Sequence, residues 1–74
     1  MANSVHVRHN GKGVILRNRY NGEMFFDDKV LAICTKTDKG TFICRHLEFG
    51  FVVEDKRKGD CLKRLFNYVE DNLR

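Results

Sequence analysis

The feature that most constrains this chain is the Asn-Gly pair at positions 10 and 11, which separates two runs that alternate apolar and polar residues. A type I′ turn needs positive φ at both central residues, and Asn-Gly is the pair that meets this requirement most readily. The sequence therefore predicts a β-hairpin, with one strand over residues 4–9 and a second over 14–20. In this register Val7 lies opposite Val14 and Val5 lies opposite Leu16, so these four side chains share one face of the hairpin.

Further turn signals divide the rest of the chain before residue 60. Asn21-Gly22 predicts another two-residue turn before a short strand over 23–26, and Asp27, Asp28 and Lys29 predict a loop. A β-rich run covers Val30 to Thr37, and Asp38-Lys39-Gly40 is typical of a three-residue loop with a G1 bulge. The chain then predicts a strand over 41–49, which continues over 50–55 after a bend at Gly50.

The last segment has the periodicity of an amphipathic helix over residues 61–73, with Asp60 as its N-cap. Its apolar stripe consists of Leu62, Leu65, Phe66, Val69 and Leu73. This stripe needs an apolar surface to cover, and the sheet is the only one in the chain. We therefore expect an α+β fold, with an antiparallel sheet of about five strands and one C-terminal helix packed on one face. Whether the sheet is open or closes into a small barrel stays undecided at this point.

Length and composition predict one small domain over residues 1–74. Hydrophobic residues make up 42% of the chain and charged residues 32%, which is an ordinary balance for a globular protein. A core of this size is marginally stable, so a homodimer or a tight partner would be a natural source of additional buried area. No apolar run approaches the roughly 18 residues of a membrane span, and the N-terminus does not resemble a secretory signal. These features favour a cytoplasmic protein without a membrane partner, and the three cysteines fit reduced, buried thiols.

Charge is distributed unevenly along the chain. Residues 1–22 contain Arg8, Lys12, Arg17 and Arg19 and no acidic residue, whereas the ten acids and ten bases that follow cancel. All of the net charge of +4 thus belongs to the first hairpin. A one-sided basic region attracts phosphate backbones, acidic proteins or anionic lipid.

The predicted register collects this charge on the face of the hairpin that the helix leaves open. That face carries His6, Arg8, Ile15, Arg17 and Arg19, and the second turn adds Met24 opposite Arg19 and Phe26 opposite Arg17. Guanidinium groups bind phosphates and an aromatic ring offers a stacking platform, so this surface is typical of nucleic-acid binding. The candidate nucleic-acid-binding residues, for DNA or RNA, are Arg8, Lys12, Arg17, Arg19 and Phe26.

Two other interpretations of the same face remain open. The arginine stems could merely cover apolar side chains. Alternatively, Ile15, Met24 and Phe26 could form a protein interface with the arginines at its rim.

No catalytic or cofactor-binding pattern is legible. Cys34, Cys44, Cys61 and His46 make a nominal Cys3His zinc set, but the close Cys-x-x-Cys spacing of such sites is missing, so we expect no metal and interpret the cysteines as core residues. His46 is expected to be a hydrogen-bonded or surface histidine. Asp27 and Asp28 are neighbours on an extended segment and would point to opposite faces, so they do not predict a nuclease site. We expect a protein that is not an enzyme and needs no cofactor.

Residues 30–74 resemble the partial RNase H-like domain of HicB-type antitoxins. The resemblance rests on the order of a Gly-containing turn, an apolar strand, a short strand and a Gly-Asp helix start. The corresponding positions are Asp38-Lys39-Gly40, Phe42, Leu47, Gly50, Gly59-Asp60, Leu65, Val69 and Leu73. It implies a non-catalytic module that dimerises and masks a small basic ribonuclease. The sequence thus favours a small regulator associated with nucleic acid, and the alternative is a protein-interaction module, either antitoxin-like or a phage-encoded inhibitor of a host protein.

Overall fold

A computed structural model describes residues 4–19 and 22–72 of the chain. They form one antiparallel sheet of six strands in sequence order, followed by one helix, which confirms the α+β class. The strand beyond the expected five is the separate segment after Gly50. The elements are β1 Ser4–His9, β2 Lys12–Arg19, β3 Glu23–Phe26, β4 Lys29–Lys36, β5 Phe42–His46, β6 Val52–Asp55 and α1 Lys58–Asn72.

The first hairpin is as predicted. Asn10 and Gly11 have φ of 54° and 78°, as a type I′ turn requires. The register pairs Val5 with Leu16 and Val7 with Val14. Val7, Val14 and Leu16 are buried, so this side of the hairpin faces the core.

The connection between β2 and β3 differs from the prediction by one residue. Arg19 pairs with Glu23, so the connection spans three positions, 20–22, and not the two of an Asn-Gly turn. Residues 20 and 21 lie outside the described residues, while Gly22 has φ of 90°. Because side chains alternate along a strand, this shift exchanges the two faces of β3. Met24 is consequently buried, and Phe25, not Phe26, lies opposite Arg17.

Asp27 and Asp28, expected in an open loop, form a tight two-residue turn. Phe26 pairs with Lys29, and both aspartates adopt positive φ, 51° and 65°. Short Asp side chains tolerate this conformation better than most residues. The turn lets β4 begin at Lys29 and pair directly with β3.

The Asp38-Lys39-Gly40 loop confirms its prediction. The Gly40 N–H donates to the Thr37 carbonyl oxygen over 3.1 Å, and Gly40 has φ of 83°. The resulting register places Cys34 opposite Cys44, with Cα atoms 4.1 Å apart.

The helix begins one turn earlier than predicted, and Asp60 is not its N-cap. The first intrahelical hydrogen bond joins the Cys61 N–H to the Arg57 carbonyl oxygen over 2.9 Å, so Arg57 occupies the cap position. Asp60 lies inside the first turn, where its charge still favours the helix dipole. Leu62, Leu65, Phe66 and Val69 are buried as expected, together with Cys61, whereas Leu73 lies outside the described residues.

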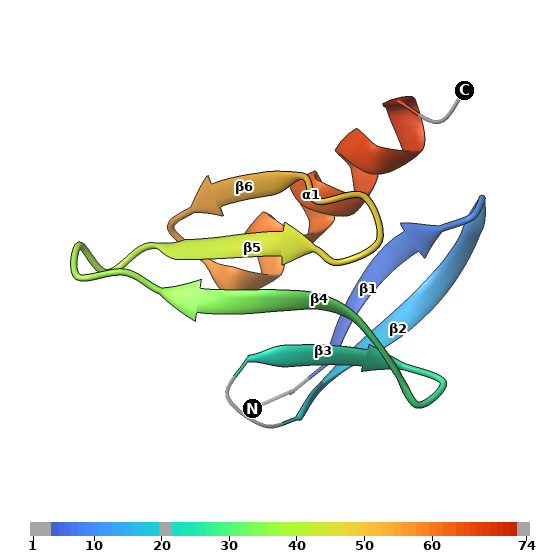
Figure 1. Cartoon of the computed structure of the whole chain (residues 1–74), viewed down its shortest axis with the longest axis horizontal. Coiled ribbons are helices and arrows are strands. Elements are labelled where there is room, and N and C mark those ends of the chain that lie inside the picture. The colour runs from blue at the N-terminus through green and yellow to red at the C-terminus, as the bar shows by residue number, and fades with distance from the viewer. Residues whose placement is uncertain (1–3, 20–21, 73–74) are drawn as a thin grey trace.

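The sheet is curled, and α1 lies inside the curl. Figure 1 shows β4, β5 and β6 side by side with α1 behind them, and the β1–β2 hairpin at an angle to these strands. The helix contacts β1 at one edge of the sheet and β5 and β6 at the other. In the described part of the chain β1 and β6 are not paired, so the sheet is open, and the helix fills the space that a closed barrel would bury. The opposite, outward face of the sheet has no helix against it.

Candidate nucleic-acid interface

A groove of about 630 Å³ lies between β2 and the β3–β4 hairpin. Lys12, Arg17 and Arg19 come from β2, while Phe25 and Phe26 come from β3. We call this set, with Ile15, Asp27 and Asp28, the β2–β3 groove. Its volume falls in the ordinary range for ligand sites.

Alternation along β2 places Arg17 and Arg19 on the open face, whereas Lys12, at the exposed start of the strand, has the parity of Val14 and Leu16. Leu16 points into the core, and its neighbours Ile15 and Arg17 are exposed, as is Arg19. Arg17 lies directly opposite Phe25 in the register. The pairing of β2 with β3 therefore builds a basic wall beside an aromatic one.

Arg19 links the two walls of the groove. Its guanidinium carbon lies 5.0 Å from the centre of the Phe25 ring, within the range of a cation–π interaction. Its Nη1 also lies 3.7 Å from Oδ1 of Asp28. The two side chains of this ion pair are 51% and 88% exposed, so the pair is weak and easily exchanged for another anion.

Four of the five residues predicted for this site line the groove: Lys12, Arg17, Arg19 and Phe26. The fifth, Arg8, is exposed on β1 but lines a separate, smaller depression of about 330 Å³ with His6 and Lys63. Phe26 stands at the end of β3, where its ring also lies edge-on to His9 at 6.5 Å.

Phe25 is the residue that the sequence prediction missed. The signal that could have found it is the glycine at the end of residues 20–22, the same position that Gly40 takes in the Asp38-Lys39-Gly40 loop. A three-residue loop there places Phe25 opposite Arg17. The acidic Asp27 and Asp28 also enter the groove, so its positive charge is partly offset at one end.

No protein-family model, curated protein or solved structure matches this chain. The assignment of the groove therefore depends on its geometry and chemistry. Within residues 4–19 and 22–72 no helix is long and apolar enough to cross a membrane.

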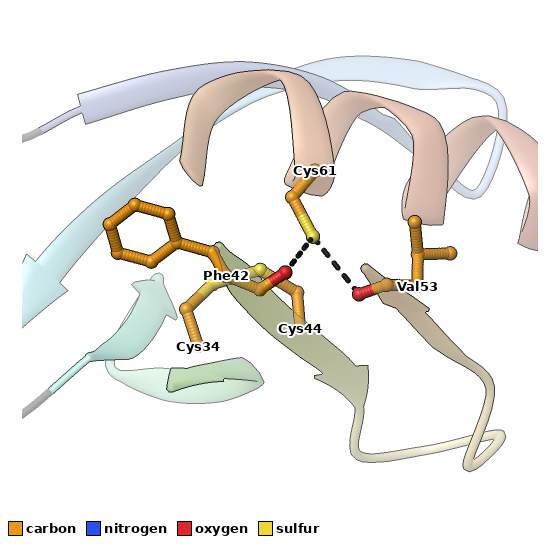
Figure 2. Close-up of a disulfide and its surroundings, with 5 residues drawn as sticks. All are labelled: Cys34, Phe42, Cys44, Val53 and Cys61. Atoms are coloured by element: carbon orange, nitrogen blue, oxygen red, sulfur yellow. Dashed lines mark hydrogen bonds between the residues drawn. A yellow bond between two sulfur atoms is a disulfide. The ribbon is translucent and has the colours of Figure 1, made fainter. Parts of the chain in front are cut away.

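The cysteines form a buried cluster between the sheet and the helix. Cys34 and Cys44 are joined by a disulfide across β4 and β5, so the expectation of three reduced thiols is wrong for this pair (Figure 2). Cys61 is a free cysteine, and its thiol can donate to the carbonyl oxygens of Val53 and Phe42, which lie 3.1 and 3.5 Å from Sγ. Burial raises the pKa of the Cys61 thiol, which favours an unreactive, neutral form. Across the described ranges, no three His, Cys, Asp or Glu side chains come together as a metal site would need.

His46 is buried and hydrogen-bonded at one of its two ring nitrogens, so the expected hydrogen bonding is present in part and the surface position is not. Its Nδ1 accepts a hydrogen bond from the Phe49 N–H over 3.4 Å, and its Nε2 has no hydrogen-bond partner among the described residues. The ring packs against Phe66 and Phe49, with centroids 4.9 and 5.2 Å away. Burial, followed by the nearby His9, lowers the pKa of His46, while Glu48 partly opposes this effect. Its burial in the core thus favours the neutral form of the ring.

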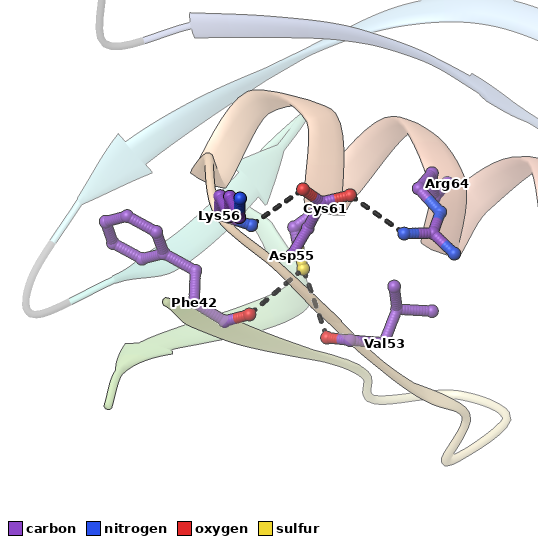
Figure 3. Close-up of polar contacts among 6 residues, drawn as sticks. All are labelled: Phe42, Val53, Asp55, Lys56, Cys61 and Arg64. Atoms are coloured by element: carbon purple, nitrogen blue, oxygen red, sulfur yellow. Dashed lines mark hydrogen bonds and ion pairs between the residues drawn. The ribbon is translucent and has the colours of Figure 1, made fainter. Parts of the chain in front are cut away.

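The start of the helix is held by Asp55 at the end of β6 (Figure 3). One carboxylate oxygen accepts the Lys56 N–H over 2.6 Å, and the other lies 2.9 Å from Nη1 of Arg64. The Arg64 side chain, then the Lys56 amide, lower the pKa of Asp55. The basic run at 56–59 thus belongs in part to the structure of the helix start.

Proposed function

We propose that this protein binds single-stranded nucleic acid in the β2–β3 groove, as a regulator without catalytic activity. The observation that carries the proposal is that Lys12, Arg17, Arg19, Phe25 and Phe26 all line one groove, with Phe25 opposite Arg17 in the register. Proteins that hold single strands combine a basic track with aromatic platforms in this way.

The basic wall of the groove would bind phosphates, and the aromatic wall would bind bases. Arg17 and Lys12 are free of ion pairs within the described residues and can contact phosphate oxygens. Arg19 can exchange its weak contact with Asp28 for a phosphate. Phe25, which lies opposite Arg17 on the open face, offers an aromatic ring to a base.

A single strand fits this site better than a duplex. Bases must be unstacked before they can lie on an aromatic side chain. Recognition of duplex DNA commonly uses a helix in the major groove. The helix of this chain instead packs its apolar stripe on the sheet.

Fluorescence anisotropy with labelled random single-stranded DNA and RNA tests the proposal. The variant Arg17→Glu/Arg19→Glu should lose binding. Lys36→Glu/Lys39→Glu makes the same change of charge at the distant β4–β5 loop and should retain most of the affinity. With three phosphate contacts, the logarithm of the binding constant should fall with the logarithm of salt concentration with a slope of about −2. Equal binding by both variants at low salt would refute the assignment.

The second candidate function is a protein-interaction module, antitoxin-like or an inhibitor of a host protein. The observation in its favour is the exposure of large apolar side chains away from the groove, including Leu47 at 43%, Phe49 at 39% and Tyr68 at 48%. Capture experiments from cell extract, with and without nuclease, separate the two candidates. A protein partner that survives nuclease and is lost in a Leu47→Asp/Phe49→Asp variant would favour the second.

A further inference from the structure

Four side chains form the corners of a square on the outward face of β5 and β6: Ile43, Arg45, Val52 and Glu54. Ile43 pairs with Glu54, and Arg45 pairs with Val52. The intervening residues Cys44 and Val53 point to the core, so all four members of the square point outward. One diagonal of the square is apolar and the other joins a positive to a negative charge.

The apolar diagonal is open to solvent. Val52 is 56% exposed and Ile43 is 36% exposed. The helix covers the opposite face of these strands, where Cys44 and Val53 meet Cys61 and Leu62. Isolated exposed apolar side chains are ordinary, but two on adjacent strands form a small continuous patch.

The two charges of the other diagonal are not engaged in ion pairs in the part of the chain that the structure describes. Neither Arg45 nor Glu54 makes an ion pair with any described residue, although cross-strand diagonal positions are only about 7–8 Å apart. One Glu54 oxygen accepts a hydrogen bond from the Thr41 hydroxyl, which holds the side chain at the border of the patch. Both charges are therefore available to an external partner.

We propose that this square binds the same square of a second copy of the chain, in a two-fold dimer. A dyad that runs along the Ile43–Val52 diagonal, in the plane between the two sheets, brings each of these residues against its own counterpart. The same rotation exchanges the other diagonal, so Arg45 of each copy faces Glu54 of the other. Two-fold interfaces require this form of self-complementarity, in which one residue contacts a second and the second contacts the first.

The presence of one positive and one negative charge in the square favours a second copy of this chain as the binding partner. A nucleic acid or another strongly charged partner would leave one of the two charges opposed to a like charge. A second copy pairs both charges and covers both apolar side chains at once. The patch is small, so we expect weak and transient dimerisation. The inference does not depend on the nucleic-acid groove, which uses β2 and β3.

Sedimentation velocity over micromolar to submillimolar concentrations tests the dimer by charge exchange. The native chain should dimerise, and Arg45→Glu and Glu54→Arg should each weaken dimerisation at least about tenfold, because each places two pairs of like charges in contact. The double variant Arg45→Glu/Glu54→Arg should restore the native affinity. Lys63→Glu, on the exposed side of the helix, should remain dimeric.

Two results would overturn the proposal. A native chain that stays monomeric at all concentrations excludes the dimer. Dimerisation that is unaffected by the single variants, or that the double variant fails to restore, excludes this surface. All three positions are exposed, and an unchanged urea midpoint confirms that each variant is folded.

Discussion

The backbone N–H of Gly11 donates a hydrogen bond to Oε1 of Glu70 over 2.6 Å, and this contact ties the tip of the first hairpin to the end of the helix across 59 positions of sequence. We expect Glu70→Ala to lower the free energy of unfolding by about 1 kcal/mol, a typical contribution of one hydrogen bond. Asp71→Ala is the matched control, since it removes a neighbouring exposed acid that makes no such contact. Removal of an acid near a helix C-terminus is by itself neutral or favourable. Equal urea midpoints for the two variants would show that the Gly11 contact contributes nothing.

Gly22 is expected to be the glycine least tolerant of substitution. Gly22 has φ of +90°, and a Cβ atom there would overlap the carbonyl oxygen of Cys34. Cys34 cannot easily move away, because its N–H donates a hydrogen bond to the Gly22 carbonyl oxygen. Gly22→Ala should therefore lose on the order of 3 kcal/mol or more. Gly40→Ala has the same backbone strain without the overlap and should lose about 1–2 kcal/mol. Gly13→Ala, with neither feature, should be nearly neutral, and thermal unfolding of the three variants checks the ranking.

The lowered pKa of His46 predicts that the free energy of unfolding falls in mild acid. Its pKa is lowered in the folded state from an ordinary value of 6.5, so the unfolded chain binds the proton more readily. The contribution of His46 to the free energy of unfolding is therefore complete above about pH 6.5, the ordinary pKa. It is lost as the pH falls toward the lower pKa of the folded state. His46→Leu should reduce the difference between the urea midpoints at about pH 7.5 and pH 5.5. An undiminished pH dependence in His46→Leu would assign the effect to other groups.

The disulfide between Cys34 and Cys44 closes a short loop, with a sequence separation of 10. The chain-entropy model gives such a loop about 2–3 kcal/mol of stabilisation. Reduction with dithiothreitol should lower the urea midpoint of the native chain and of Cys61→Ala alike. The Cys34→Ala/Cys44→Ala variant should be insensitive to the reductant. A native midpoint that does not change on reduction would mean that the bond adds nothing to stability.

Asp28 should act against the proposed function of the groove. Its carboxylate lies 3.7 Å from Nη1 of Arg19 and competes with phosphate for that group. Asn tolerates the positive φ of 65° at this position, so Asp28→Asn should preserve the turn and tighten oligonucleotide binding about two- to fivefold. Asp38→Asn, which makes the same change in charge at the β4–β5 loop, should have a smaller effect. Equal gains in the two variants would indicate net charge alone, with no role for this ion pair.

Much of the fold follows from short-range rules that act within a few residues. Positive φ at Asn10 and Gly11 determines the first hairpin, and its register then places Arg17 and Arg19 on the open face. The glycine at position 40 determines the register that brings Cys34 opposite Cys44. The stripe from Leu62 to Val69 likewise determines which side of the helix is buried. In each case the pattern and the turn chemistry agree, so no distant contact is needed to decide the outcome.

The sequence by itself therefore determined the fold class, two hairpin registers and the basic character of one face. Tertiary structure decided which aromatic ring completes the groove. Arg19 pairs with Glu23, and the Cys34 N–H donates to the Gly22 carbonyl oxygen. The connection between β2 and β3 therefore has three residues, which shifts β3 by one position. A shift of one residue exchanges every side chain between faces, so Phe25 takes the place expected for Phe26 and Met24 enters the core. The burial of His46 beside His9 and Phe66 also depends on contacts between distant segments, which local propensity cannot encode.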